Sequence, residues 1–179
     1  MRYIDRWGLM RNTQVENIQE HSHMVAVLAH ALAVIENKYF DGQVDPGAVA
    51  VAALYHDASE IITGDMPTPV KYFSPTLRAA VAEAEADAKD TLLAMLPGEM
   101  QEVYADLLYC EDEQTERLVK AADVLDAYIK CIEEQKAGNT EFDSAAKQSM
   151  DAMLALNMPE LQWFIDECLE PFGLNIDQL

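Results

Sequence analysis

The chain has 179 residues, half of them apolar, and a formal net charge of −20. This length supports one well-buried core and is too short for two ordinary domains. The acidic balance excludes nucleic acid as a partner, because binding it requires a basic surface that displaces counterions, and it also disfavours anionic membranes.

Neither a membrane-spanning apolar run nor a charged-then-apolar leader is present in the sequence. We therefore expect a cytoplasmic protein with no membrane partner. The cysteines have an odd count and no close spacing, which favours reduced, packed thiols over a disulfide framework. They are Cys110, Cys131 and Cys168.

Apolar residues at helical spacing predict a first helix over residues 16–38. Its buried stripe consists of Val25, Leu28, Leu32 and Ile35. His21 continues this stripe toward the N-terminus, so its imidazole is expected to point inward. His23 and His30 fall on the opposite side of the helix.

A second helix is predicted over residues 46–63, with Asp45 as its N-cap and Gly64 as its stop. One face of it carries Val49, Ala53, His56 and Glu60, and Asp57 lies beside that face. The next segment, residues 65–69, contains two prolines that predict an extended, rigid loop. Such a loop can wall a substrate pocket or simply connect two helices.

The rest of the chain is also helical in pattern, with no convincing alternating strand. Further helices are predicted over residues 75–96, 100–107, 115–136, 142–156 and 159–169. The expected fold is all-α, a bundle of about six to eight helices that forms a single domain over residues 1–179.

Two histidines and several carboxylates suggest a metal site. His21, the pair His56-Asp57, and a later carboxylate form a suitable ligand set for a divalent ion such as Mn, Fe, Co or Zn. Charged groups in an apolar helix are unfavourable unless they are paired or bound to a metal. The later carboxylate is Asp123 or Asp126, because both lie near one edge of the same helical stripe. A core histidine and a chance His-Asp dipeptide are the plainer interpretation.

Five segments carry a resemblance to a known family. They are residues 6–12 (RWGLMRN), 16–22 (ENIQEHS), 55–60 (YHDASE), 63–73 (TGDMPTPVKYF) and 119–123 (VKAAD). Together they resemble the bacterial 5′-deoxynucleotidases (YfbR-like), which are HD-domain metal-dependent phosphohydrolases. The dipeptide His-Asp is common by itself, whereas the Arg-Trp element and the Gly-Asp-Met-Pro-Thr-Pro run make this resemblance specific.

The resemblance implies a reaction and a set of site residues. The reaction is the hydrolysis of deoxyribonucleoside 5′-monophosphates to deoxynucleoside and phosphate. The implied ligands of one divalent ion are His21, His56, Asp57 and Asp123. Glu60 is the expected general acid or base, with a pKa raised by burial, and Asp65 is a second candidate for proton transfer or for binding the sugar.

The implied substrate contacts lie in two segments of the chain. Arg6 corresponds to the residue that orients the phosphate, and Trp7 to the residue that packs against the sugar and disfavours a 2′-hydroxyl. The substrate loop corresponds to Asp65, Met66, Pro67 and Thr68. Arg11 and Lys71 are further possible neighbours of the phosphate. A homodimer is expected.

Two alternatives stay open on the sequence alone. A related HD-domain hydrolase could act on deoxynucleoside triphosphates or another phosphoester, although a triphosphate needs more cations than Arg6, Arg11 and Lys71 supply. A non-catalytic module that binds metal or nucleotide is the other alternative. The presence of Glu60 and Asp65 argues against it.

Overall fold

The computed structural model describes residues 1–178, and helices dominate this range. The α-helices are α1 (Ile18–Tyr39), α2 (Pro46–Tyr55), α3 (Glu60–Thr63), α4 (Thr68–Lys71), α5 (Pro75–Ala94), α6 (Gly98–Tyr109), α7 (Glu113–Lys136), α8 (Asp143–Ala155) and α9 (Pro159–Cys168). Short 3₁₀ turns follow at Thr140–Phe142, Glu170–Gly173 and Ile176–Gln178. Within residues 1–178 the only β-type pairing is an isolated bridge between Asp5 and Asn17. The prediction of an all-α bundle is confirmed.

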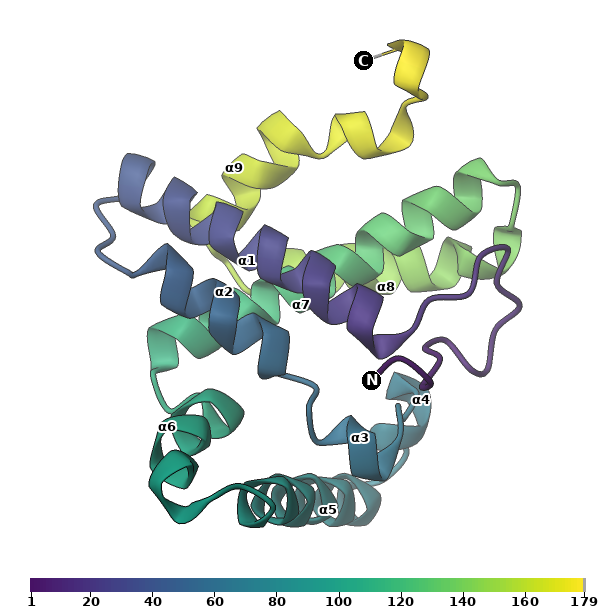
Figure 1. Cartoon of the computed structure of the whole chain (residues 1–179). Coiled ribbons are helices and arrows are strands. Elements are labelled where there is room, and N and C mark those ends of the chain that lie inside the picture. The colour runs from purple at the N-terminus through teal and green to yellow at the C-terminus, as the bar shows by residue number, and fades with distance from the viewer. Residues whose placement is uncertain (179) are drawn as a thin grey trace.

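Helix α1 is the centre of the packing. It contacts α2, α7 and α9, and Figure 1 shows α1 and α2 side by side, with the α5–α6 pair at one end of the molecule and α9 at the other. The predicted stripe of α1 is buried throughout, and His21 at its N-terminal end has 0% exposure. His23 and His30 are exposed, as their position on the opposite side predicts.

The start of α1 is set by a capping box. The side chain of Asn17 accepts hydrogen bonds from the backbone N–H groups of Gln19 and Glu20, and the Glu20 carboxylate accepts from the Asn17 N–H. Such a box satisfies donors that the first helical turn leaves free. It therefore fixes the first turn of α1, which carries His21.

The prediction of one continuous helix over residues 46–63 is wrong. Helix α2 ends at Tyr55, and residues 56–59 form turns before α3 begins. The backbone here switches to bonds between residues three apart, such as Ala58 N–H to Tyr55 O at 2.9 Å and Glu60 N–H to Asp57 O at 3.1 Å. This tighter winding rotates the following side chains away from their places on an ideal helix.

The predicted loop over residues 65–69 is extended over only part of its length. Residues 64–67 have no helical structure, whereas Thr68 and Pro69 already belong to the one-turn helix α4. Pro69 stands in the first turn of α4, where its missing N–H costs nothing. No helix in residues 1–178 is long and apolar enough to cross a membrane. The three cysteines are free.

A buried carboxylate fastens the N-terminal segment to the end of α7. Glu134 is 1% exposed and accepts hydrogen bonds from Lys130 Nζ at 2.6 Å and from Thr13 N and Oγ1 at 2.9 and 2.8 Å. Lys130 also donates to the carbonyl of Gln14 at 2.7 Å. Burial raises the pKa of Glu134, but these donors outweigh burial and hold the pKa at about 2. The segment that follows Trp7 is therefore tied to the bundle.

Removing this carboxylate should destabilise the fold. Glu134→Ala leaves the Lys130 ammonium buried without its charge partner, and we expect the free energy of unfolding to fall by about 3–5 kcal/mol. Glu133→Ala changes an exposed neighbour on the same helix and should stay within about 0.5 kcal/mol of the wild type. Urea unfolding monitored by circular dichroism measures both, and equal losses would contradict the assignment. Because the pKa of Glu134 is depressed, its contribution is present above pH 4.5 and is lost as the pH falls toward 2.

Candidate metal centre and substrate site

Four of the predicted site residues come together from three parts of the chain. His21 lies in the first turn of α1, His56 and Asp57 follow α2, and Asp123 lies in α7. His21 Nε2 is 3.2 Å from Asp123 Oδ1 and 3.4 Å from Asp57 Oδ2. His56 Nε2 is 3.2 Å from the same Asp57 oxygen. We call these four residues the His-Asp cluster.

Both imidazoles of the His-Asp cluster are oriented by hydrogen bonds at Nδ1. His21 Nδ1 is 2.6 Å from Asp126 Oδ2, and His56 Nδ1 is 2.7 Å from the carbonyl oxygen of Ala53. Carboxylate and carbonyl oxygens only accept, so each Nδ1 carries the hydrogen. Each Nε2 is then free to offer its lone pair to a cation, the usual arrangement of metal-binding histidines.

The Nε2 atoms also show that the cluster fits a cation. The Nε2 atoms of His21 and His56 are buried and have no hydrogen-bond partner. Buried polar atoms are rarely left in this state. Nitrogen or oxygen atoms of His21, His56 and Asp123 lie within 4.8 Å of one another. Two imidazole nitrogens facing carboxylates form a donor set that suits a borderline divalent ion.

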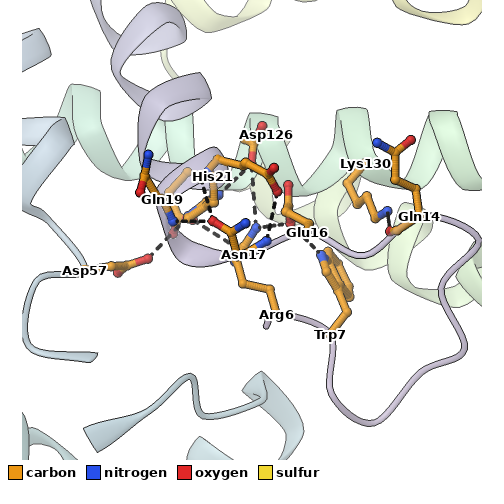
Figure 2. Close-up of polar contacts among 12 residues, drawn as sticks. Arg6, Trp7, Gln14, Glu16, Asn17, Gln19, His21, Asp57, Asp126 and Lys130 are labelled. Atoms are coloured by element: carbon orange, nitrogen blue, oxygen red, sulfur yellow. Dashed lines mark hydrogen bonds and ion pairs between the residues drawn. The ribbon is translucent and has the colours of Figure 1, made fainter. Parts of the chain in front are cut away.

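The structure gives different places to the two aspartates that helical periodicity could not separate. Asp126 lies behind His21, where it accepts from Nδ1, whereas Asp123 lies in front of Nε2. Figure 2 shows Asp57 and Asp126 approaching the His21 ring from different sides. The Asp123 side chain is 41% exposed, so the cluster is open to solvent on that side.

The charges of the cluster compensate one another strongly. Burial raises the pKa of Asp57, but His21 and His56 outweigh it and hold that pKa well below its usual range. Burial lowers the pKa of His21, but the neighbouring aspartates outweigh burial and raise it well above its ordinary value. A proton and a metal ion therefore compete for the same imidazole nitrogen.

Glu60 and Asp65 experience the negative charge of the cluster. Burial, followed by the charges of Asp57 and Asp65, raises the pKa of Glu60 to about 8. This confirms the predicted direction of its shift. Burial also raises the pKa of Asp65. One carboxylate oxygen of Glu60 is buried without a hydrogen-bond partner, so it is free to bond to a ligand.

Arg6 and Trp7 lie at the edge of the cluster. The Arg6 guanidinium is 3.6 Å from Asp126 and 4.0 Å from Asp123, and its side chain is 13% exposed. Trp7 packs its ring against Phe142, with 5.1 Å between ring centroids. Both residues donate to Glu16, at 2.7 Å from Arg6 and 3.2 Å from Trp7. Sequence spacing does not predict these contacts of Glu16, because only the folded loop brings its carboxylate to the two donors.

The remaining predicted contacts lie in the segment after α3, in α4 and in the N-terminal segment. Met66 and Pro67 are half-buried and Thr68 is exposed. The ammonium group of Lys71 pairs with Glu85 at 2.7 Å. Arg11 is almost fully exposed and pairs with an acidic residue on the 3₁₀ turn before α8. Of the three cations considered for the phosphate, Arg6 is the one whose contacts place it beside the cluster.

Comparison with known sequences agrees with this geometry. Residues 1–172 match the family described as 5′-deoxynucleotidase YfbR-like. The chain is similar to a 5′-deoxynucleotidase of Photobacterium profundum, with 45% identity over 181 residues that cover 100% of this chain and 93% of the relative. A 5′-deoxynucleotidase of Cronobacter sakazakii is 45% identical over 183 residues, which cover 100% of this chain and 91% of the relative.

Solved structures share the fold at lower identity. An HD-domain phosphohydrolase from Listeria innocua has a TM-score of 0.83 and 24% identity, and the alignment covers 94% of this chain and 82% of that one. The HD phosphohydrolase DatZ of cyanophage S-2L, solved with dA and one catalytic Zn²⁺ ion, has a TM-score of 0.67 and 23% identity, with coverage of 93% and 91%. These likenesses confirm an HD-domain helical bundle.

The bond between Asp126 and His21 should matter for metal affinity. Asp126→Asn removes the charge that orients the imidazole, and we expect affinity for Mn²⁺ to fall about 10- to 100-fold. Isothermal titration calorimetry measures this change. Asp151→Asn alters an exposed aspartate on α8 and serves as the control. Unchanged affinity in Asp126→Asn would contradict the role that we assign to this bond.

Proposed function

The chain belongs to the YfbR-like 5′-deoxynucleotidase family, and we propose that it hydrolyses deoxyribonucleoside 5′-monophosphates with one bound divalent cation. The observation that carries the proposal is the pair of buried, unpartnered Nε2 atoms of His21 and His56, which face Asp57 and Asp123. The names of the relatives supply the substrate class.

The His-Asp cluster is the proposed metal site. His21 and His56 would bind through Nε2, and Asp57 and Asp123 through carboxylate oxygens, with an ion such as Mn, Fe, Co or Zn. When bound, the ion supplies an acidified water and neutralises charge on the phosphoryl group. Asp126 and the carbonyl of Ala53 keep the two imidazoles in the tautomer that ligation requires.

Glu60 is the proposed proton carrier. Burial, followed by the charges of Asp57 and Asp65, raises the pKa of Glu60 to about 8, so its protonated form can donate a proton to the departing 5′-oxygen of the nucleoside. A cation at the cluster would favour the ionised form, which can instead accept a proton from the attacking water. Asp65 is the second candidate for this transfer or for binding the sugar hydroxyl.

Arg6 and Trp7 are the proposed substrate contacts from the N-terminal segment. The planar guanidinium of Arg6 suits a phosphate, because its donors match two oxygens at once. Trp7 is proposed to pack against the sugar. Met66 and Pro67 in the loop after α3, and Thr68 at the start of α4, are proposed to contact the substrate. Arg6 is the single cation of the three candidates beside the cluster, which favours a monophosphate over a triphosphate.

Domain, assembly and location form part of the proposal. We propose that residues 1–179 form one HD-type domain that works as a cytoplasmic homodimer. Free cysteines suit a reducing compartment. Large apolar side chains are exposed around α5 and α6 and offer a surface that a second copy could bury. They include Phe73, Met95 and Val103.

A phosphate-release assay tests the function. The wild type, titrated with divalent metals, should release phosphate from deoxyribonucleoside monophosphates in preference to ribonucleoside monophosphates and triphosphates. His56→Ala should reduce release to background and lose the metal, while the protein stays helical, because one ligand is missing. His30→Ala changes an exposed histidine of α1 and should behave as the wild type. A His56→Ala protein that binds one equivalent of metal normally would refute the ligand assignment.

Glu60→Gln separates proton transfer from binding. The amide keeps the size of the side chain but cannot exchange a proton, so kcat should fall by roughly two to four orders of magnitude. Metal content, measured by elemental analysis, should not change. Asp65→Asn is the comparison variant and should lose less activity. If Asp65→Asn loses more than Glu60→Gln, Asp65 is the proton carrier instead.

A further inference from the structure

Glu16 joins the two residues that we assign to the phosphate and the sugar. A single oxygen, Oε2, accepts from Arg6 Nη1 at 2.7 Å and from the indole Nε1–H of Trp7 at 3.2 Å. Figure 2 shows this carboxylate between the two donors. The Glu16 side chain is 16% exposed and that of Arg6 13%, so solvent and salt screen this ion pair little.

The backbone holds Glu16 in register with Arg6. The Arg6 N–H donates to the Glu16 carbonyl at 2.9 Å, and the Ile18 N–H donates to the Ile4 carbonyl at 3.0 Å. Asn17, the next residue, is the N-cap of α1. The carboxylate of Glu16 is therefore anchored to a helix start, whereas the residues that it holds lie in a loop.

Trp7 has a backbone conformation that requires support. Its φ is 61°, in the left-handed region that bulky side chains disfavour. Such conformations persist where the surroundings impose them, and they cluster at functional sites. The surroundings here are Glu16, which holds the indole nitrogen, and Phe142, which packs against the ring.

We propose that Glu16 is a positioning residue that sets sugar selectivity, because one carboxylate oxygen fixes Arg6 and Trp7 relative to each other. The inference rests on the proposed function through the roles of those two residues. An indole held in one orientation excludes a 2′-hydroxyl by steric conflict, whereas an indole that can rotate away leaves room for that hydroxyl. Glu16 also lies within 4.8 Å of ligand atoms of His21 and Asp126. These three residues are not a second metal site in our proposal, because the Arg6 guanidinium pairs with both carboxylates.

Two variants test the hydrogen bond from its two sides. Glu16→Gln removes the charge, and Trp7→Phe removes the indole N–H but keeps an aromatic ring. In metal-loaded protein, each should narrow the ratio of kcat/KM for deoxyadenosine over adenosine 5′-monophosphate by about tenfold, the value of one charge-assisted hydrogen bond. Metal content should not change. In the double variant, the ratio should narrow no further than in Trp7→Phe alone, because without the indole N–H there is no bond left for Glu16→Gln to weaken.

Glu36→Gln is the matched control. Glu36 is another poorly exposed carboxylate that accepts from two side chains, Arg117 at 3.0 Å and Gln114 at 2.8 Å, at the opposite end of α1. The Glu36→Gln variant should have a lower free energy of unfolding than the wild type, but the same ratio of kcat/KM for the two monophosphates. If Glu16→Gln behaves in the same way, or if it loses the metal, the inference is overturned.

Two readouts separate this inference from the proposed function. Glu16→Gln should shift the indole N–H resonance of Trp7 in an NMR spectrum and leave that of Trp163, the other tryptophan, unchanged; an unshifted Trp7 resonance overturns the inference. If the wild type releases no phosphate, the proposed function fails. In that case the test is the ratio of the dissociation constants of deoxyadenosine and adenosine 5′-monophosphate, measured in the wild type and in Glu16→Gln. A ratio that narrows in Glu16→Gln supports it, and an unchanged ratio overturns it.

Discussion

The functional end of the molecule depends on one fully buried imidazole. His21 has 0% exposure, and a buried polar ring is tolerated only where its nitrogen atoms have partners. Asp126 meets this need at Nδ1. At Nε2, Asp57 and Asp123 are close but make no hydrogen bond. A divalent cation is favourable at this point, because it would bind the unpartnered Nε2 lone pair and offset the charges of the two facing carboxylates.

The protein and the proposed substrate are both negatively charged, so the net charge of the protein repels the substrate. The chain carries −20, and a nucleoside monophosphate is an anion. Solvent-exposed charges are largely screened beyond about 8 Å at physiological ionic strength. The charges near the cluster therefore determine whether an anion can bind there. There, a bound cation would offset Asp57 and Asp123, and the poorly exposed Arg6 adds a second positive group. The distant surface charge is then compatible with binding an anion.

Helical periodicity predicted the parts of the site that lie on regular helices. The apolar stripe of α1 was enough to place His21 inward and to leave His23 and His30 outside. The same periodicity failed after Tyr55, because the backbone there forms hydrogen bonds between residues three apart, whereas a period of 3.6 residues assumes bonds between residues four apart. It also could not separate Asp123 from Asp126, which lie about one turn apart and take opposite sides of the same ring.

The contacts of Glu16 and Trp7 could not be predicted from the sequence for a different reason. They arise in a loop whose left-handed residue and shared hydrogen-bond acceptor exist only after the chain has folded. The division follows the architecture: helices and the turn after α2 supply the proposed metal ligands, whereas loops supply the proposed contacts with the sugar and phosphate. An HD-domain protein only 24% identical to this one keeps the same bundle. Loop residues can change with little effect on such a bundle, so loop contacts can diverge while the bundle is kept.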